Sequence, residues 1–226
     1  MAGDNKISIS RLIAVPALIT LAVTLLRLVG ELEHWGKLGF NNAVGGGGAL
    51  VGISWLPFIF GPYFAVKLAN RGERWSSGKR AWGYWGLGFV ILFASGALMA
   101  LVASKNLHAL EIAGYAGMLV AAFVMTVGWR ALGRTLIAYA FAARIPVLVV
   151  MFLAMRGNGG AGWGTHYDAV EPGFASASFA GKFFYLAFLP QMFFWIAWTV
   201  LVGALTGFIA FAIVRRKNAA ASSASA

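Results

Sequence analysis

Residues 132–155 read LGRTLIAYAFAARIPVLVVMFLAM. This apolar run has one arginine, Arg134, close to its start and another, Arg144, near its middle. The run is 24 residues long, and a helix needs about 20 apolar residues to cross the hydrocarbon core of a bilayer. A charge at that depth costs at least about 2.5 kcal/mol, so Arg144 is expected to have a specific partner. The stretch therefore predicts a transmembrane helix that carries a structural or functional arginine.

The composition extends this prediction to the whole chain. It has 226 residues, of which 60% are hydrophobic and 11% charged, with a mean hydropathy of +0.78. A soluble domain would have about 25% charged residues, so this chain cannot cover itself with polar surface. We therefore expect an all-α integral membrane protein whose partner is the lipid bilayer. The absence of cysteine excludes disulfides, thiolate metal ligands and cysteine nucleophiles.

Apolar stretches divide the chain into six predicted spans within one transmembrane domain, residues 12–214. The spans are about 12–30, 43–68, 82–103, 109–128, 132–155 and 183–214. A short segment, 1–11, precedes them, the longest outer loop is 156–182, and the tail 215–226 is predicted to be disordered. Prolines inside several spans should kink those helices. The predicted fold is thus a six-transmembrane-helix bundle with several proline-kinked helices.

The lysines and arginines predict the orientation of the bundle. With both termini in the cytoplasm, inner segments carry 12 of them and outer segments carry 4, not counting the two arginines within spans. Such a bias in short loops is the positive-inside signal of a multi-pass protein of the cell (plasma or inner) membrane, with N-in and C-in termini. The net charge of +11 is explained by these membrane edges, so no nucleic acid partner is expected.

Glycine is abundant, with 29 residues, and several pairs lie four apart, such as Gly203 and Gly207 or Gly48 and Gly52. Small residues at this spacing allow membrane helices to approach closely. Glycine-rich helix packing can serve one bundle, a homo-oligomer, or the packing of partner membrane subunits. The spacing does not distinguish between these uses.

The predicted topology gathers the histidines on the outer side, together with five of the seven acids. Three imidazoles on three segments, with a carboxylate or water, would suit zinc. The candidate metal ligands are His34, His108, His166, Glu111 and Asp168. Such a metal could activate water for hydrolysis, although no pair of histidines has the spacing of a known metal motif.

Two further readings of the outer residues stay open. His34 and His108 could hold a b-type haem, and His166 could act as a general acid or base with Asp168 or Glu171. On a helix continuing the first span, Arg27, Glu31 and His34 would form one polar stripe, because they are four and three residues apart.

Arg144 and Arg27 are the candidate ligand-binding residues. No acid is predicted at the depth of Arg144, which could instead meet carbonyls freed by prolines or the hydroxyls of Ser54, Thr126 or Thr199. It could also bind an anionic substrate or a lipid phosphate, for which the guanidinium fork is suited. Arg27 can reach outward or pair with Glu31.

These observations leave three functional hypotheses. The first, favoured by Arg144, is binding or transport of a small ligand, anionic or lipid-like, between proline-broken helices. The second is a membrane enzyme with an outward-facing histidine and carboxylate metal site. The third is a non-catalytic accessory subunit of a membrane complex. The sequence alone does not decide whether the chain is an enzyme.

Overall fold

The protein is all-helical in the computed structural model, which describes residues 8–102 and 107–224, without the side chains of residues 108 and 216–224. No strand occurs in these ranges. Five helical segments are long and apolar enough to cross a membrane, which supports a multi-pass membrane protein. They are α1 (Ile9–Leu32), α3 (Gly78–Val102), α4 (His108–Gly128), α5 (Arg130–Gly160) and the segment Phe179–Arg215, most of which belongs to α7 (Trp195–Ala224).

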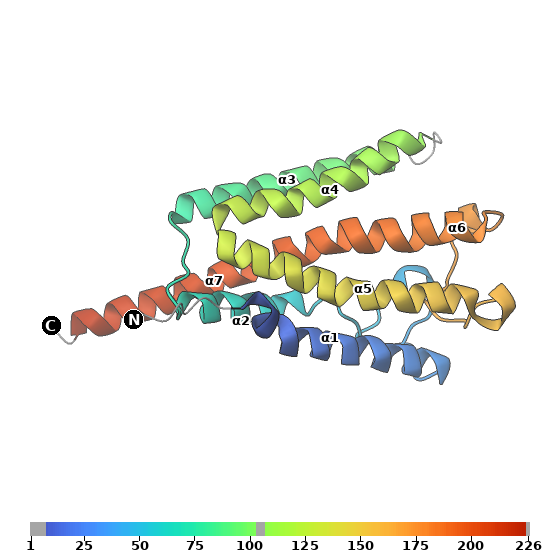
Figure 1. Ribbon diagram of the computed structural model, residues 1–226, viewed down its shortest axis with the longest axis horizontal. Helices are drawn as coiled ribbons and strands as arrows, with labels where there is room; N and C mark the ends of the chain where they lie inside the picture. The colour runs from blue at the N-terminus through green and yellow to red at the C-terminus, as the bar shows by residue number, and fades with distance from the viewer. Residues whose placement is uncertain (1–7, 103–106, 225–226) are drawn as a thin grey trace.

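The helices run back and forth along one long axis (Figure 1). α1 begins and α7 ends at the same end of the molecule, where the chain also passes from α2 (Pro57–Ala69) to α3 and from α4 to α5. We call this the basic end, because Arg71 and Arg74 lie in the α2–α3 link and Arg80 lies in the first turn of α3. Helix α3 packs mainly against α4, α2 against α7, and α1 against α5.

The predicted span 43–68 differs most from the structure. Only α2, 13 residues long, is α-helical, and at 1.5 Å per residue it covers about 20 Å, less than the hydrocarbon core. Before it, residues Val44–Gly46 form a single 3-10 turn (η1), and the glycines from Gly45 to Gly48 all have positive φ. Positive φ is incompatible with a right-handed helix, so the glycine run cannot be part of the predicted helix. The helix begins only at Pro57, a residue that is favoured in the first turn.

The last predicted span, 183–214, is longer and less regular than expected. It begins with α6 (Phe179–Lys182) and continues through two π-helical stretches, η4 (Phe183–Phe188) and η5 (Pro190–Phe194), before α7. Proline has no N–H to donate to the preceding turn, which is consistent with irregular hydrogen bonding around Pro190. Helix α7 then runs to Ala224, through the residues predicted to form a disordered tail. Several of these are alanines, which favour helix.

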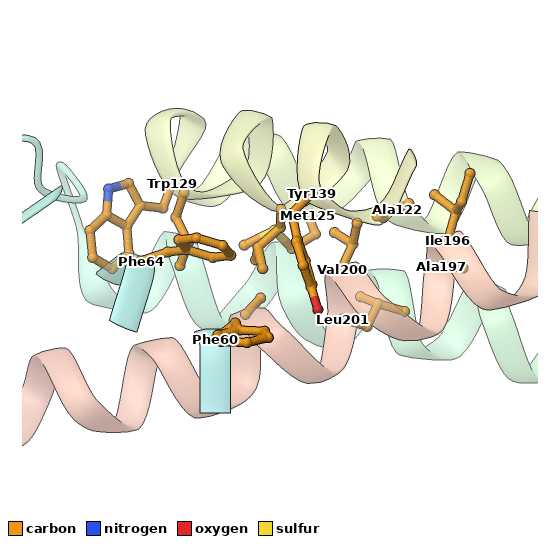
Figure 2. Close-up of a cluster of buried hydrophobic side chains, with 14 of the residues drawn as sticks. Phe60, Phe64, Ala122, Met125, Trp129, Tyr139, Ile196, Ala197, Val200 and Leu201 are labelled. Atoms are coloured by element: carbon orange, nitrogen blue, oxygen red, sulfur yellow. The ribbon is translucent and has the colours of Figure 1, made fainter. Parts of the chain in front are cut away.

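A buried aromatic and aliphatic cluster joins α2, α5 and α7 (Figure 2). Phe60 and Phe64 of α2 each meet the ring of Tyr139 on α5 edge to face, at centroid distances of 5.4 and 5.5 Å. Val200 of α7 is fully buried among them. The Tyr139 hydroxyl lies 2.8 Å from the hydroxyl of Thr20, which ties α1 to the same cluster.

Helices α2 and α7 approach each other at glycines. A Cβ at Gly61 would overlap the carbonyl oxygen of Gly203, and a Cβ at Gly207 would lie 3.0 Å from the carbonyl oxygen of Gly61. The backbones are therefore in direct contact, as small residues allow in membrane helices. Gly48 and Gly52, the other spaced pair, lie outside any α-helix.

Candidate functional site

Arg27 and Glu31 form an ion pair at the end of α1 that faces away from the basic end. The Arg27 Nε donates to Glu31 Oε1 over 2.8 Å, and the two residues are 9% and 2% exposed. The four-residue spacing places both side chains on one helix face. Of the two alternatives expected for Arg27, the structure has the pairing with Glu31, and the pair is buried.

The same guanidinium holds the segment before α2. The Arg27 Nη2 donates to the backbone carbonyls of Asn41, at 3.1 Å, and Gly46, at 2.9 Å. Gly46 has a φ of +81°, and a Cβ there would lie 2.8 Å from Nη2. Only glycine both adopts this conformation without strain and lets the backbone approach so closely. Arg27 thus fixes the glycine-rich segment against α1.

His166 completes this cluster from the connection between α5 and α6. Both its backbone N–H and its ring Nδ1 lie 2.8 Å from Glu31 Oε2, although 135 residues separate the two in sequence. One carboxylate therefore accepts hydrogen bonds from a guanidinium, a main-chain amide and an imidazole. We call Arg27, Glu31 and His166 the α1 cluster.

Burial sets the protonation of the residues in this connection. It lowers the pKa of His166 below its ordinary value near 6.5, although the bond to Glu31 favours the charged ring. A neutral ring must then carry its proton on Nδ1, because a carboxylate only accepts. Burial likewise raises the pKa of the neighbouring Tyr167, whose hydroxyl donates to the carbonyl of Thr24 over 3.2 Å. The connection is thus fixed to α1 by two side chains.

His34 does not continue the polar stripe of α1, so that expectation is wrong. Helix α1 ends at Leu32, and His34 has a φ of +53°. The amides of His34 and Trp35 donate to the carbonyls of Glu31 and Gly30, the paired bonds of a Schellman motif. His34 occupies the left-handed position of this cap and is exposed, away from the helix face of Arg27.

The other predicted metal ligands do not gather in the described part of the chain. No three His, Cys, Asp or Glu side chains there come close enough to hold a metal. Asp168 accepts from the amides of Gly164 and Thr165 within its own loop, and Glu111 lies in the first turn of α4. The side chain of His108 lies outside the described residues, so the zinc site stays a prediction. His166 bonds Glu31 instead.

Arg144 lies in the middle of α5 and is 4% exposed. Its Nη1 makes a long hydrogen bond of 3.4 Å to Gln191 Oε1, and its guanidinium lies over the ring of Trp195, 4.6 Å from the centroid. Its Nε is buried without a hydrogen-bond partner among the described residues. No carboxylate there pairs with this charge, in agreement with the absence of an acid at its predicted depth.

A cavity of about 270 Å³ connects Arg144 with the α1 cluster. Arg27 and His166 line it at one side, and Arg144, Gln191 and Trp195 line it at another. Between them the wall is mostly apolar and comes from α1, the segment before α2, α5 and the π-helical stretches. These wall residues include Val23, Ile53, Val147, Met151, Leu186 and Pro190. Both predicted ligand-binding arginines thus face one space.

The buried charges around this cavity do not cancel. Arg27 is neutralised by Glu31, and burial keeps His166 neutral, whereas Arg144 has no carboxylate partner in the described chain. Glu171 also lines the cavity, but it is exposed. The buried groups therefore have a net charge of +1. An anion inside the cavity would remove the electrostatic cost of that charge.

Sequence reasoning missed two residues of this site, Gln191 and Trp195. Gln191 directly follows Pro190 and lies four residues before Trp195, so a polar residue next to a helix-breaking proline was an available signal. Comparisons with protein-family models, curated proteins and solved structures found no match. The function is therefore argued from the site alone.

Proposed function

We propose that this polytopic membrane protein binds or transports a small anionic ligand in the cavity between Arg27 and Arg144. The observation that carries the proposal is the environment of Arg144, a buried guanidinium with an unpaired Nε beside an open cavity. A charge inside a membrane-spanning helix is costly and marks a functional site by default. A structural role would have supplied a carboxylate, as Glu31 does for Arg27.

The walls of the cavity indicate the kind of anion. Polar groups line it around Arg144 and Gln191 and around Arg27 and His166, and aliphatic side chains such as Val147 and Met151 line much of the space between them. A ligand with a carboxylate or phosphate head and a short apolar tail satisfies both parts, because apolar pockets with few polar groups orient amphipathic ligands. The ring of Trp195 covers one face of the Arg144 guanidinium, which leaves the edge of the guanidinium for the anion.

The proposal includes the predicted topology, with six crossings and both termini in the cytoplasm of the cell membrane. The alternating direction of the helices and the basic loops at one end support it. Helix α2 is too short to cross alone, and residues 43–56 would complete its passage while lining the cavity. Non-helical backbone at membrane depth is tolerated where it is buried in protein or lines a cavity.

The ligand test uses octanoate and hexyl phosphate as anionic probes and octanol as their uncharged counterpart. Purified protein in detergent is heated with each probe, and the midpoint of unfolding is recorded. We expect both anions, and not octanol, to raise the midpoint, because only they compensate Arg144. In Arg144→Gln the anion effect should disappear.

The matched control is Arg156→Gln, an exposed arginine on the same helix that does not line the cavity. It should respond to the anions as the unaltered protein does. A response of Arg144→Gln equal to that of the control, or the absence of any anion effect, would contradict the proposal.

The topology is tested separately by single cysteines, since the chain has none of its own. A membrane-impermeant maleimide should label Gly173→Cys in intact cells and should label Glu73→Cys only after the membrane is opened. The two positions lie in the connections 161–178 and 70–77. The reverse pattern would invert the bundle without affecting the ligand test.

A further inference from the structure

A second hollow lies at the basic end of the molecule and shares no lining residue with the first cavity. Its volume is about 310 Å³. The α2–α3 link provides one wall and the junction of α4 and α5 provides the other. Its lining residues are Arg74, Trp75, Ser76, Arg80, Val127, Gly128, Trp129 and Arg130. A smaller hollow shares Arg74, Trp75 and Ser76 and adds Arg215.

The two tryptophans of this hollow have unused hydrogen-bond donors. The Nε1 atoms of Trp75 and Trp129 are buried and have no partner among the described residues. Trp129 is 2% exposed, and its nitrogen lies on the edge of the ring turned away from Phe64 and Tyr139 (Figure 2). An indole N–H can only donate, and leaving it buried without an acceptor is destabilising. Both donors therefore call for an acceptor at this place.

The charges around the hollow have no internal counterpart either. Arg74, Arg80 and Arg130 are exposed and form no ion pair within the described chain. Glu73 is exposed and does not line the hollow, and Arg80 also lies over the ring of Tyr84. Three guanidinium groups and two tryptophans with unpaired N–H groups thus line this space, and no carboxylate lines it.

Two helices begin at the same hollow. α5 starts at Arg130 with no side-chain cap, whereas at α3, which starts at Gly78, the Ser77 hydroxyl accepts from the amide of Arg80. The first N–H groups of a helix are free to bind an anion, and the helix dipole favours negative charge there. The field of the two helices adds to that of the arginines.

We propose that this hollow binds a phosphate group, independently of the ligand proposed for the first cavity. A phosphate presents several oxygens in different directions, so it can accept from more than one guanidinium and from an indole N–H at once. The hollow lies where apolar helices end, at the depth at which bilayers place their headgroups. The phosphate of an anionic phospholipid reaches this position with its chains along the apolar surface of the bundle.

The test titrates purified protein in detergent with dihexanoyl phosphatidic acid and, separately, with inorganic phosphate. Binding is followed by calorimetry. We expect phosphatidic acid to bind, and Arg74→Gln/Arg130→Gln to bind it at least about tenfold more weakly, since a hydrogen bond to a charged group contributes that much. The matched control, Arg71→Gln/Arg134→Gln, removes two exposed arginines from the same elements that do not line the hollow. It should change the affinity by less than about twofold to threefold.

Trp129→Phe gives a second readout, because it removes the donor and keeps an aromatic ring. It should weaken phosphatidic acid binding, with an unchanged circular dichroism spectrum showing that the helices are retained. Inorganic phosphate binding with the same dependence on Arg74 and Arg130 would support the phosphate site and assign it to a soluble phosphate. Equal losses in the two double variants, or no binding of either probe, would overturn the proposal. Neither result bears on the Arg144 test.

Discussion

Arg27 and Arg144 are two buried arginines that line one cavity, yet their surroundings are opposite. Arg27 donates to a carboxylate and to two backbone carbonyls. Arg144 has a long bond to one amide oxygen, a tryptophan ring, and a buried Nε without a partner in the described chain. The protein thus supplies Arg27 with a counter-charge, whereas Arg144 has no carboxylate partner in the described chain.

This difference separates two uses of the same side chain. A guanidinium that pairs with a carboxylate and donates to backbone carbonyls holds segments together, and here it joins α1 to residues 41–46. A guanidinium with free donors beside a cavity reduces the stability of the empty protein and increases its affinity for an anion. The two arginines should therefore respond in opposite ways when the protein is altered.

The largest effect is expected from Glu31→Gln. The change leaves Arg27 buried without a counter-charge and weakens both hydrogen bonds from His166, so unfolding should become easier by about 3–5 kcal/mol. Chemical unfolding in detergent measures it. Glu33→Gln, an exposed acid two residues away, should cost less than about 0.5 kcal/mol. A similar cost for both would show that the α1 cluster does not stabilise the fold.

A smaller effect should follow from Gly46→Ala, which tests the contact of Arg27 with the backbone. The φ of +81° costs about 1–2 kcal/mol for alanine, and the added Cβ must displace the guanidinium. Gly45→Ala has a similar φ, +70°, with nothing within 4 Å of its Cβ. The difference between the two variants in unfolding free energy isolates the contact. Equal losses in the two variants would show that the Arg27 guanidinium can move away from the added Cβ without loss of stability.

The next effect is on the pH dependence of stability. Burial lowers the pKa of His166 in the folded protein, whereas the unfolded chain takes up its proton near the ordinary value of about 6.5. As pH falls through that value, protons bind the unfolded state preferentially, so stability decreases towards the lower folded pKa. The charged and titratable neighbours are Arg27, Glu31 and Asp168.

Thermal unfolding between pH 7.5 and 5.5 measures this dependence. His166→Gln should reduce the loss of stability over this interval. His34→Asn removes an exposed histidine whose left-handed conformation asparagine tolerates, and it should leave the loss unchanged. An equal loss in the unaltered protein and in His166→Gln would assign the dependence to other groups.

The smallest effect is expected from Arg144→Met, in contrast to Glu31→Gln. Replacing a buried charge that lacks a partner by an apolar side chain of similar length is often neutral or stabilising. The unfolding free energy of the ligand-free protein should therefore stay within about 1 kcal/mol of the original or increase. A loss above about 3 kcal/mol would show that Arg144 holds the bundle together and would remove the contrast with Arg27.

Local spacing predicted part of this site. The pair Arg27 and Glu31 follows from a separation of four residues on one helix, and the burial of Arg144 follows from its place in a long apolar run. The prediction for His34 was wrong, because α1 ends at Leu32 and the helix cap turns the chain before His34 can join the helix face. Helix ends depend on a few dihedral angles that hydrophobic periodicity does not report.

The remaining site residues depend on contacts that spacing cannot show. Glu31 and His166 meet across 135 residues, and the cavity exists because the chain before α2 leaves the helical path. The glycine run from Gly45 was visible in the sequence, but its apolar neighbours were consistent with a span. Gln191 reaches Arg144 because the π-helical stretch η5 packs against α5, a contact that the spacing in sequence does not show.

The contact of Gly61 with Gly203 has a mechanical consequence. Two backbones that touch without intervening side chains cannot slide or rotate past each other by small rotamer changes, so α2 and α7 behave as one rigid body. Widening of the cavity then requires displacement of its other walls, which are α1, α5, the π-helical stretches and the 161–178 connection. The hydrogen bond between Glu31 and His166 holds α1 to the 161–178 connection, so these two walls should move together.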